Sequence, residues 1–145
     1  FDYDFELLGN LCGQYWRHTI PKETLVIHLR NGDSVFTSVN RVVTCAKDYW
    51  ERAVEVTPAG QKPTLRLVTI QHYGANEQTG QFFANEQKVA RGNDAVKQVV
   101  NGLEDIGYDV TIQSSEDSDV DFCTLTQAHD VCLSMGSCLP ENYSF

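Results

Sequence analysis

The chain has 145 residues, of which 41% are hydrophobic and 21% charged, a composition typical of one globular domain with a sizeable core. Its net charge of −9 and its 11 scattered basic residues argue against a nucleic-acid partner, because phosphate backbones require clustered Lys and Arg. No apolar run reaches the roughly 18 residues that a transmembrane helix needs, so we expect no membrane contact within this segment.

Residues 1–20 place leucines and aromatic side chains at helical spacing before Pro21, which predicts a helix or a linker from an upstream domain. Residues 21–145 are predicted to form one α/β domain. Because no helix follows the last strand predicted below, we expect this domain to be truncated at its C-terminal end.

Residues 24–29 form a continuously apolar, β-branched run, which predicts a strand buried on both faces of a parallel sheet. Residues 34–44 show no clear period and are predicted to form a loop. Residues 47–56 place apolar side chains on one side of a helix, and residues 64–70 repeat the buried-strand pattern.

Residues 72–85 are polar and contain glycine, which predicts a loop. Asn93 is a suitable N-cap for a helix that presents apolar residues on one face as far as Ile106, and Gly107 follows at the usual C-terminal position. Residues 108–112 alternate between apolar and polar side chains, which predicts a third strand.

The acidic stretch 116–121 favours the first turn of another helix, whose expected buried side consists of Phe122, Leu125 and Ala128. A fourth strand is predicted over residues 130–135. Strands that alternate with helices predict an α/β fold of Rossmann-like type, with a mostly parallel sheet flanked by helices.

None of the five cysteines forms a CxxC pair or stands at zinc-finger spacing to a histidine, so no metal site is expected. A protein of the secretory pathway could pair some of them. Cys123 and Cys132 lie in apolar patterns, which favours the simpler interpretation that they are small buried hydrophobic residues.

In open α/β sheets, ligands bind beyond the carboxyl ends of the strands. Arg30 follows the first predicted strand at that end, where its guanidinium can bind two phosphate oxygens at any working pH. Asp33 could orient Arg30 or bind a ribose or sugar hydroxyl, and Gly32 allows a tight turn. The alternative is a structural Arg–Asp pair that ties the turn, with His28 a satisfied core histidine.

Gly136 and Ser137 follow the fourth predicted strand, and backbone N–H groups in such a turn suit a phosphate. An ordinary strand-to-loop turn is the alternative. Asp117, Asp119 and Asp121 look like a metal-binding run, but the favoured interpretation is a solvated first turn of a helix. The common dinucleotide and P-loop motifs are absent, as is a nucleophile in a GxSxG setting.

The segment from Val26 to Asp33, with its H-x-R-x-G-D pattern, resembles the strand-borne motif of the fucosyltransferase superfamily that includes α1,2-, α1,6- and protein O-fucosyltransferases. The segment from Asp121 to Ser137 is similar to that superfamily's closing pattern, in which an acidic residue, an apolar helix and an apolar strand lead to a Gly/Ser turn at the nucleotide. The order and spacing of the two segments also resemble the family. The chain departs from it at residues 138–143, which intervene where the family has a compact turn.

This resemblance implies that residues 21–145 are the nucleotide-sugar-binding, C-terminal part of a GT-B enzyme. It implies transfer of fucose from GDP-fucose, with inversion, to a glycan or protein acceptor, without a cofactor or an obligatory metal. Arg30 would be the catalytic residue on the diphosphate, His28 and Asp33 would shape the donor pocket, and Gly136 and Ser137 would complete it. The enzyme would lie in the lumen of the Golgi or the endoplasmic reticulum.

Two other functions stay open from the sequence. One is a non-catalytic module that binds a nucleotide or a glycan, which the departure at residues 138–143 favours. The other is a purely structural α/β domain. No general base for the acceptor hydroxyl is identified.

Overall fold

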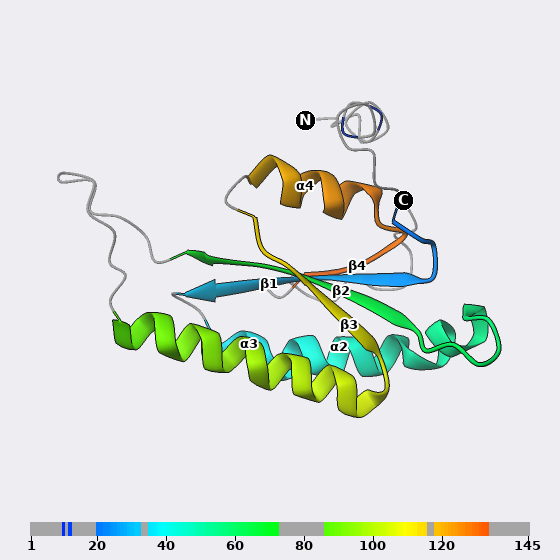
Figure 1. The fold of residues 1–145 in the computed structure, drawn as a ribbon, viewed down its shortest axis with the longest axis horizontal. Coiled ribbons are helices and arrows are strands. Elements are labelled where there is room, and N and C mark those ends of the chain that lie inside the picture. The colour runs from blue at the N-terminus through cyan, green and yellow to red at the C-terminus, as the bar shows by residue number, and fades with distance from the viewer. Residues whose placement is uncertain are drawn as a thin grey trace.

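The computed structural model describes residues 10, 12, 20–32, 35–72, 86–115 and 118–133. The elements within these ranges, in chain order, are β1 (Thr24–Gly32), α2 (Val35–Val56), β2 (Thr64–His72), α3 (Glu86–Ile106), β3 (Asp109–Gln113), α4 (Ser118–Gln127) and β4 (Asp130–Leu133). The strands form one parallel sheet in the order β3-β2-β1-β4 (Figure 1). The predicted parallel α/β fold is therefore confirmed.

The two faces of the sheet are covered by different helices. α2 and α3 lie on one face, below the sheet in Figure 1, and α4 lies on the other. From β1 the chain moves outward to β2 and β3, and then returns past β1 to β4. The direction of the strand order therefore reverses between β1 and β4, as it does between the two halves of a doubly wound Rossmann sheet.

The core lies mainly between the sheet and the α2/α3 layer. Because successive side chains of a strand point to opposite faces, β1 sends Leu25, Ile27 and Leu29 into this core and Val26 into a smaller cluster beneath α4. β2 repeats the pattern in register. The buried members of the main core are Leu25, Ile27, Leu29, Val42, Cys45, Ala46, Ala53, Leu65, Leu67, Val99, Leu103, Tyr108 and Cys132.

α2 begins at Val35, so the prediction of a loop over residues 34–44 is wrong wherever the structure describes that stretch. Many of these residues are Val or Thr, whose stiff side chains lower intrinsic helix propensity. Val42, Cys45 and Ala46 are nevertheless buried against the sheet. Tertiary burial of one helix face therefore outweighs the weak local preference.

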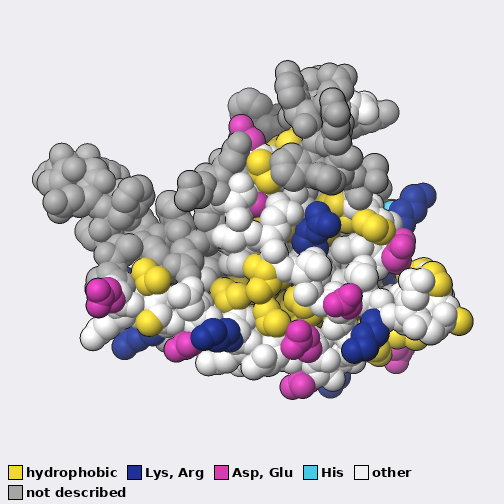
Figure 2. Space-filling model, in the orientation of Figure 1, with side chains coloured by type: hydrophobic (Ala, Val, Ile, Leu, Met, Phe, Trp, Pro, Cys, Tyr) yellow, Lys and Arg dark blue, Asp and Glu magenta, His cyan; other side chains and the backbone are white. Residues whose placement is uncertain are grey.

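α3 begins at Glu86, well before the predicted N-cap, and Asn93 is an exposed residue within the helix. The helix presents Gly92, Ala95, Val99 and Leu103 to the core at intervals of three and four residues. On its outer face, acidic and basic side chains are interspersed rather than grouped by sign, as Figure 2 shows.

The predicted buried side of α4 is correct at Leu125 and Ala128 and wrong at Phe122. Phe122 is 47% exposed, whereas Thr124 is fully buried and Leu125 and Ala128 pack beneath the helix as expected. The prediction for Phe122 is wrong because the buried face follows the sequence Asp121, Thr124, Leu125 and Ala128, which includes two polar side chains. A search for apolar residues alone therefore includes Phe122 and misses Asp121 and Thr124.

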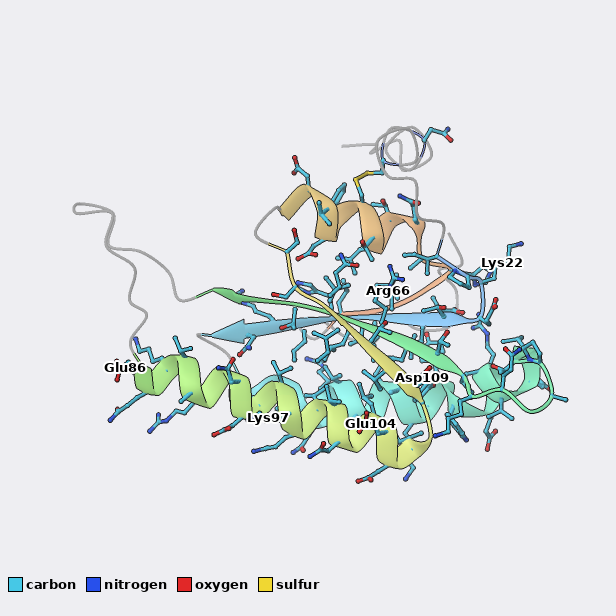
Figure 3. All side chains as sticks on the ribbon, viewed as in Figure 1. Lys22, Arg66, Glu86, Lys97, Glu104 and Asp109 are labelled. Carbon is cyan, nitrogen blue, oxygen red and sulfur yellow. A yellow bond between two sulfur atoms is a disulfide. The ribbon has the colours of Figure 1, made fainter. Side chains whose placement is uncertain are left out.

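Two disulfides correct the interpretation of Cys123 and Cys132 as unpaired hydrophobic residues. Cys12 is bonded to Cys123 in α4, and Cys45 in α2 is bonded to Cys132 in β4. Their Cα atoms are 5.1 and 6.8 Å apart. Figure 3 shows a disulfide, drawn in yellow, beside α4. Each bond closes a loop of about 90–110 residues. In the chain-entropy model, the lost entropy of the unfolded chain stabilises the folded state by about 4–5 kcal/mol for each bond.

Several sequence predictions concern residues outside the part of the chain that the structure describes. Of residues 1–20, the structure describes Asn10, Cys12 and Ile20, so most of the predicted upstream helix or linker lies outside the described residues. The same holds for residues 73–85 of the predicted loop and for residues 134 and 135 of the fourth predicted strand.

The turn from α3 into β3 is anchored on α2 by aromatic side chains. Gly107 ends α3 with a φ of +124°, as its predicted C-terminal position requires. The Trp50 and Tyr108 rings meet edge to face, 4.8 Å between centroids. The buried Tyr108 hydroxyl donates a hydrogen bond of 2.9 Å to the carbonyl oxygen of Ala46. The turn therefore has no room for a side chain at residue 107.

We expect Gly107→Ala to lower the free energy of unfolding by about 2–4 kcal/mol, through backbone strain and overpacking. A Cβ at this position would lie 2.6 Å from the Trp50 ring. Gly60→Ala is the matched control, because Gly60 also has a positive φ, of +84°, but nothing within 4 Å of its Cβ position. Urea unfolding of both variants measures the difference, and equal losses would contradict the role given to Trp50.

Tyr108 should make stability depend on alkaline pH. Burial raises the pKa of Tyr108 from 10.0 to about 12, so the stabilising neutral form is fully present below pH 10 and is lost as the pH rises towards 12. We expect up to about 2.7 kcal/mol of unfolding free energy to disappear over this interval. Tyr108→Phe should lack this part of the pH dependence. An unchanged alkaline profile in that variant would contradict the assignment.

Candidate functional site

The topology places the candidate site at the carboxyl ends of β1 and β4. In doubly wound sheets, ligands bind outside the carboxyl ends at the point where the strand order reverses, which here lies between these two strands. Arg30 lies near the carboxyl end of β1, opposite Ile70 of β2, and β4 pairs with β1 as far as His28 and Leu133. The strand that carries Arg30 therefore ends at the reversal point.

β1 is longer than the predicted 24–29 and includes Arg30 itself. The alternation of the strand places Arg30 on the same face as Val26 and His28, which is the face covered by α4. Asn31 points to the opposite face, where it is buried and its Nδ2 donates to the Gly92 carbonyl oxygen at 3.3 Å. The extended backbone therefore brings the two predicted residues His28 and Arg30 to one side of the sheet.

Burial and two nearby charged residues shift the pKa of the His28 imidazole. Burial lowers the pKa of the His28 imidazole below its ordinary value, the Asp121 carboxylate raises it, and the Arg30 guanidinium lowers it. The burial effect is the largest, so His28 is held in its neutral form. A neutral imidazole can both donate and accept a hydrogen bond, which suits a ligand base or hydroxyl.

Asp121 is a buried carboxylate, whereas the acidic pattern of residues 117–121 predicts a solvated first turn. It does lie in the first turn of α4, but it is only 7% exposed. Its Oδ1 accepts a hydrogen bond of 2.9 Å from Gln113 Nε2, which also donates to Thr124 Oγ1 at 2.9 Å. Thr124 Oγ1 in turn donates to the Val120 carbonyl oxygen at 2.9 Å.

This network fixes Asp121 between α4 and the sheet, because a buried charge requires hydrogen-bonding partners. The helix-capping interpretation is therefore insufficient for Asp121, whereas Asp119 is exposed as expected. The sequence signal that pointed to Asp121 was its place in the closing pattern of the resemblance. Gln113 carried no signal, because only the register of β3 against β2 places it opposite Val68 and near α4.

The rest of the predicted site lies outside the described residues. This holds for Asp33, Gly136, Ser137 and Asp117. Among the residues that the structure does describe, no group of three or more His, Cys, Asp or Glu side chains is placed to hold a metal ion. Within the same ranges, no helix is long and apolar enough to cross a membrane.

A pocket of about 340 Å³ lies elsewhere, at the amino edge of the sheet. It is lined by Leu25 at the start of β1, by Arg52 in α2 and by Asp130 at the start of β4. Because it lies at the opposite end of β1 from Arg30, it is separate from the candidate site.

No known protein family, curated protein or solved structure matches the chain. A fold of this type hosts many functions. The fold alone therefore does not define the function, which depends on the residues at the carboxyl edge of the sheet.

The coupling between His28 and Asp121 is directly testable. We expect the imidazole of His28 to titrate below 6.5, and Asp121→Asn to lower its pKa further, because the variant removes the charge that opposes the burial effect. Asp119→Asn, an exposed change on the same helix, should leave the pKa of His28 unchanged. NMR titration of the imidazole resonances measures the pKa of His28 in the wild type and in both variants.

The stability that His28 confers by staying neutral should be present above pH 6.5 and be lost as the pH falls through its lowered pKa. A His28 resonance that titrates at or above 6.5, or one that does not respond to Asp121→Asn, would contradict this arrangement.

Proposed function

We propose that this chain is the donor-binding part of a fucosyltransferase-like glycosyltransferase of GT-B type. It would transfer fucose from GDP-fucose, with inversion, to a hydroxyl group of a glycan or protein. The observation that carries this proposal is the position of Arg30 near the carboxyl end of β1, at the reversal point of a parallel sheet. The H-x-R-x-G-D pattern that contains Arg30 gives the proposal its substrate class.

The chemistry required of Arg30 is stabilisation of charge. Breaking the bond between the sugar and the diphosphate places negative charge on the leaving phosphate, and a fixed guanidinium binds two of its oxygens without a metal ion. Asp33, Gly136 and Ser137 are the further residues proposed for this donor site. The acceptor hydroxyl also needs a general base that takes its proton.

His28 and Asp121 suit recognition of a neutral part of the donor. His28 is held neutral by burial, and Asp121 is held in place by Gln113. A carboxylate accepts hydrogen bonds, and a neutral imidazole both donates and accepts them. Together they can bind N–H and hydroxyl groups of a nucleoside. Both lie on the Arg30 side of the sheet.

The two disulfides support a location in the secretory pathway, such as the lumen of the Golgi or the endoplasmic reticulum. Disulfides persist in oxidising compartments and are rare in the cytosol. Both bonds join segments that are far apart in the chain, and the one between Cys45 and Cys132 lies inside the main core.

A non-catalytic nucleotide-binding module is the second candidate. The segment 138–143, which departs from the compact turn of the family, favours it. The two candidates agree on GDP binding and differ on turnover of GDP-fucose. Binding of GDP without turnover by the intact protein would therefore select the second candidate.

The central test is Arg30→Lys in the intact protein, followed by calorimetry with GDP and GDP-fucose. Lysine keeps the charge but cannot form two parallel hydrogen bonds to phosphate. Because a charge-assisted hydrogen bond is worth about 1.5–3 kcal/mol, we expect affinity to fall at least about tenfold. Turnover should fall further, since charge on the diphosphate grows towards the transition state.

Arg66→Lys is the matched control, because Arg66 lies in β2 on the α4 side of the sheet, opposite Val26 and nearer the amino edge (Figure 3). It should bind GDP normally. A structural Arg30 would give a lower melting temperature for Arg30→Lys, with unchanged affinity in the folded fraction. That result would remove Arg30 from the donor site.

A further inference from the structure

The pocket at the amino edge is built from three segments that are distant in the sequence. Lys22 and Glu23 precede β1, Tyr49 and Arg52 come from α2, and the third wall is formed by the start of β4. Figure 3 shows Lys22 at this edge. Leu25, which also lines the pocket, is about 16 Å from Arg30 along β1 at a rise of about 3.3 Å per residue. The pocket and the proposed donor site therefore lie apart on the same sheet.

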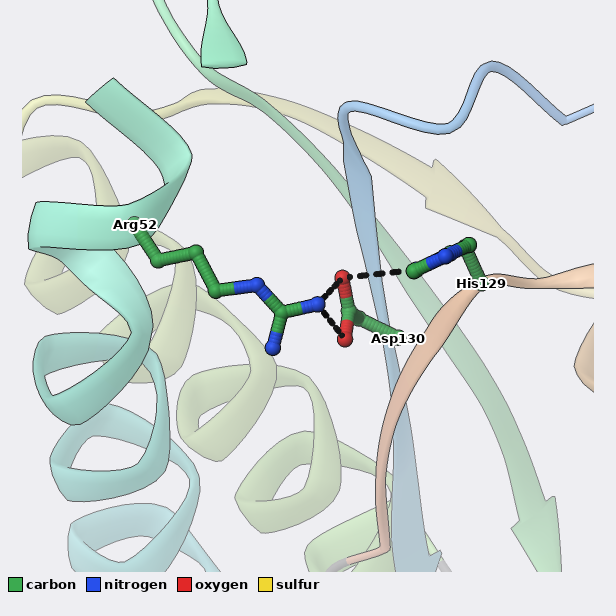
Figure 4. A network of polar contacts seen from close by, with 3 residues as sticks. All are labelled: Arg52, His129 and Asp130. Carbon is green, nitrogen blue, oxygen red and sulfur yellow. Dashed lines mark hydrogen bonds and ion pairs between the residues drawn. The ribbon is translucent and has the colours of Figure 1, made fainter. Parts of the chain in front are cut away.

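One wall of the pocket is an interlocked set of polar side chains (Figure 4). Arg52 Nη2 donates to both carboxylate oxygens of Asp130, at 2.6 and 2.8 Å, and His129 Nδ1 lies 3.2 Å from Asp130 Oδ2. The Arg52 guanidinium carbon also lies 5.9 Å from the centre of the Tyr49 ring. Each side chain restrains the next, so a ligand would meet a largely preformed wall.

Arg52 keeps donors for a ligand while it holds Asp130. Its contact with the carboxylate uses Nη2 alone, whereas a guanidinium has five N–H donors. The Arg52 side chain is 52% exposed and that of Asp130 is 24% exposed, so both can be reached from solvent. The pair therefore offers donors and acceptors side by side.

The lining of the pocket indicates a neutral ligand. The positive charges of Lys22 and Arg52 are balanced by those of Glu23 and Asp130, so an ionic ligand would meet like charge as well as opposite charge. Hydroxyl groups, in contrast, both donate and accept hydrogen bonds, so they can bind the cationic and the anionic side chains of the pocket alike.

The apolar part of the lining completes the match. Leu25, Ala53 and Val56 contribute aliphatic surface, and Tyr49 contributes an aromatic ring. The C–H face of a sugar ring can pack on such surface while its hydroxyls bind the charged rim. The volume of about 340 Å³ lies at the lower end of the about 300–1,000 Å³ of small-molecule sites, which suits a sugar unit rather than a long chain.

We propose that the amino-edge pocket binds a neutral sugar unit of a glycan, held by Arg52, Asp130 and Tyr49. On a glycosyltransferase, such a site would keep a branched acceptor attached to the donor domain and raise its effective concentration. The pocket shares no residue with the donor site, so sugar binding here does not depend on the proposed transfer activity.

The test is an NMR titration of the whole chain with the methyl glycosides of glucose, galactose, mannose, fucose and N-acetylglucosamine. Acetate and inorganic phosphate serve as anionic probes. We expect at least one glycoside to shift the amide resonances of Tyr49, Arg52, His129 and Asp130, with a dissociation constant on the order of 1 mM, since a small ligand gains limited free energy. The same shifts should persist when the protein is saturated with GDP.

Arg52→Ala and Tyr49→Ala should each weaken the binding at least about fivefold, which corresponds to the loss of about one hydrogen bond or ring contact. Arg41→Ala is the matched control, because Arg41 is an exposed arginine of the same helix that does not line the pocket. It should bind like the wild type.

Three results would overturn the proposal. The first is the absence of pocket shifts with every glycoside, and the second is stronger binding of acetate or phosphate than of any neutral sugar. The third is a set of glycoside shifts located away from the pocket. The wild-type shift map decides each case, so the conclusion stands even if a variant fails to fold.

Discussion

The burial of β1 on both faces is the constraint on which the rest of the structure depends. β1 is flanked by β2 and β4, and its side chains enter the α2/α3 core and the α4 cluster alternately. Since a strand in this position has no solvent-facing side, its register cannot slip by one residue without exchanging the two sets. The same constraint determines which of its polar side chains share a face.

The candidate site is a direct consequence of that alternation. Leu25, Ile27 and Leu29 occupy the main core, which leaves His28 and Arg30 on the α4 side of the same strand. There the charges of Asp121 and Arg30 act on His28 in opposite directions, and burial keeps His28 neutral. Packing on one face of β1 and chemistry on the other are thus specified by neighbouring residues of a single segment.

Buried polar side chains are not all satisfied within the part of the chain that the structure describes. There, Asn31 Oδ1 and Thr69 Oγ1 in β1 and β2, and Gln127 Nε2 at the end of α4, are buried without a hydrogen-bonding partner, and each such group costs about 1–3 kcal/mol. At the amino end of the sheet, Arg52 and Asp130 pair, and Thr24 and Thr64 share a hydrogen bond of 2.8 Å. These pairs join β1 to β2 and α2 to β4, so polar contacts as well as apolar packing hold that end together.

The sequence by itself predicted the parallel sheet, because apolar strand segments alternate with helical segments that can cover both faces of a sheet. It also located Gly107 at a helix end, where a positive φ favours glycine, and placed Arg30 near the carboxyl end of a strand. Only the tertiary structure decided the extent of α2, the burial of Asp121 and the pairing of the cysteines. Each of these depends on contacts between segments that are distant in the chain, and local propensity carries no information about such contacts.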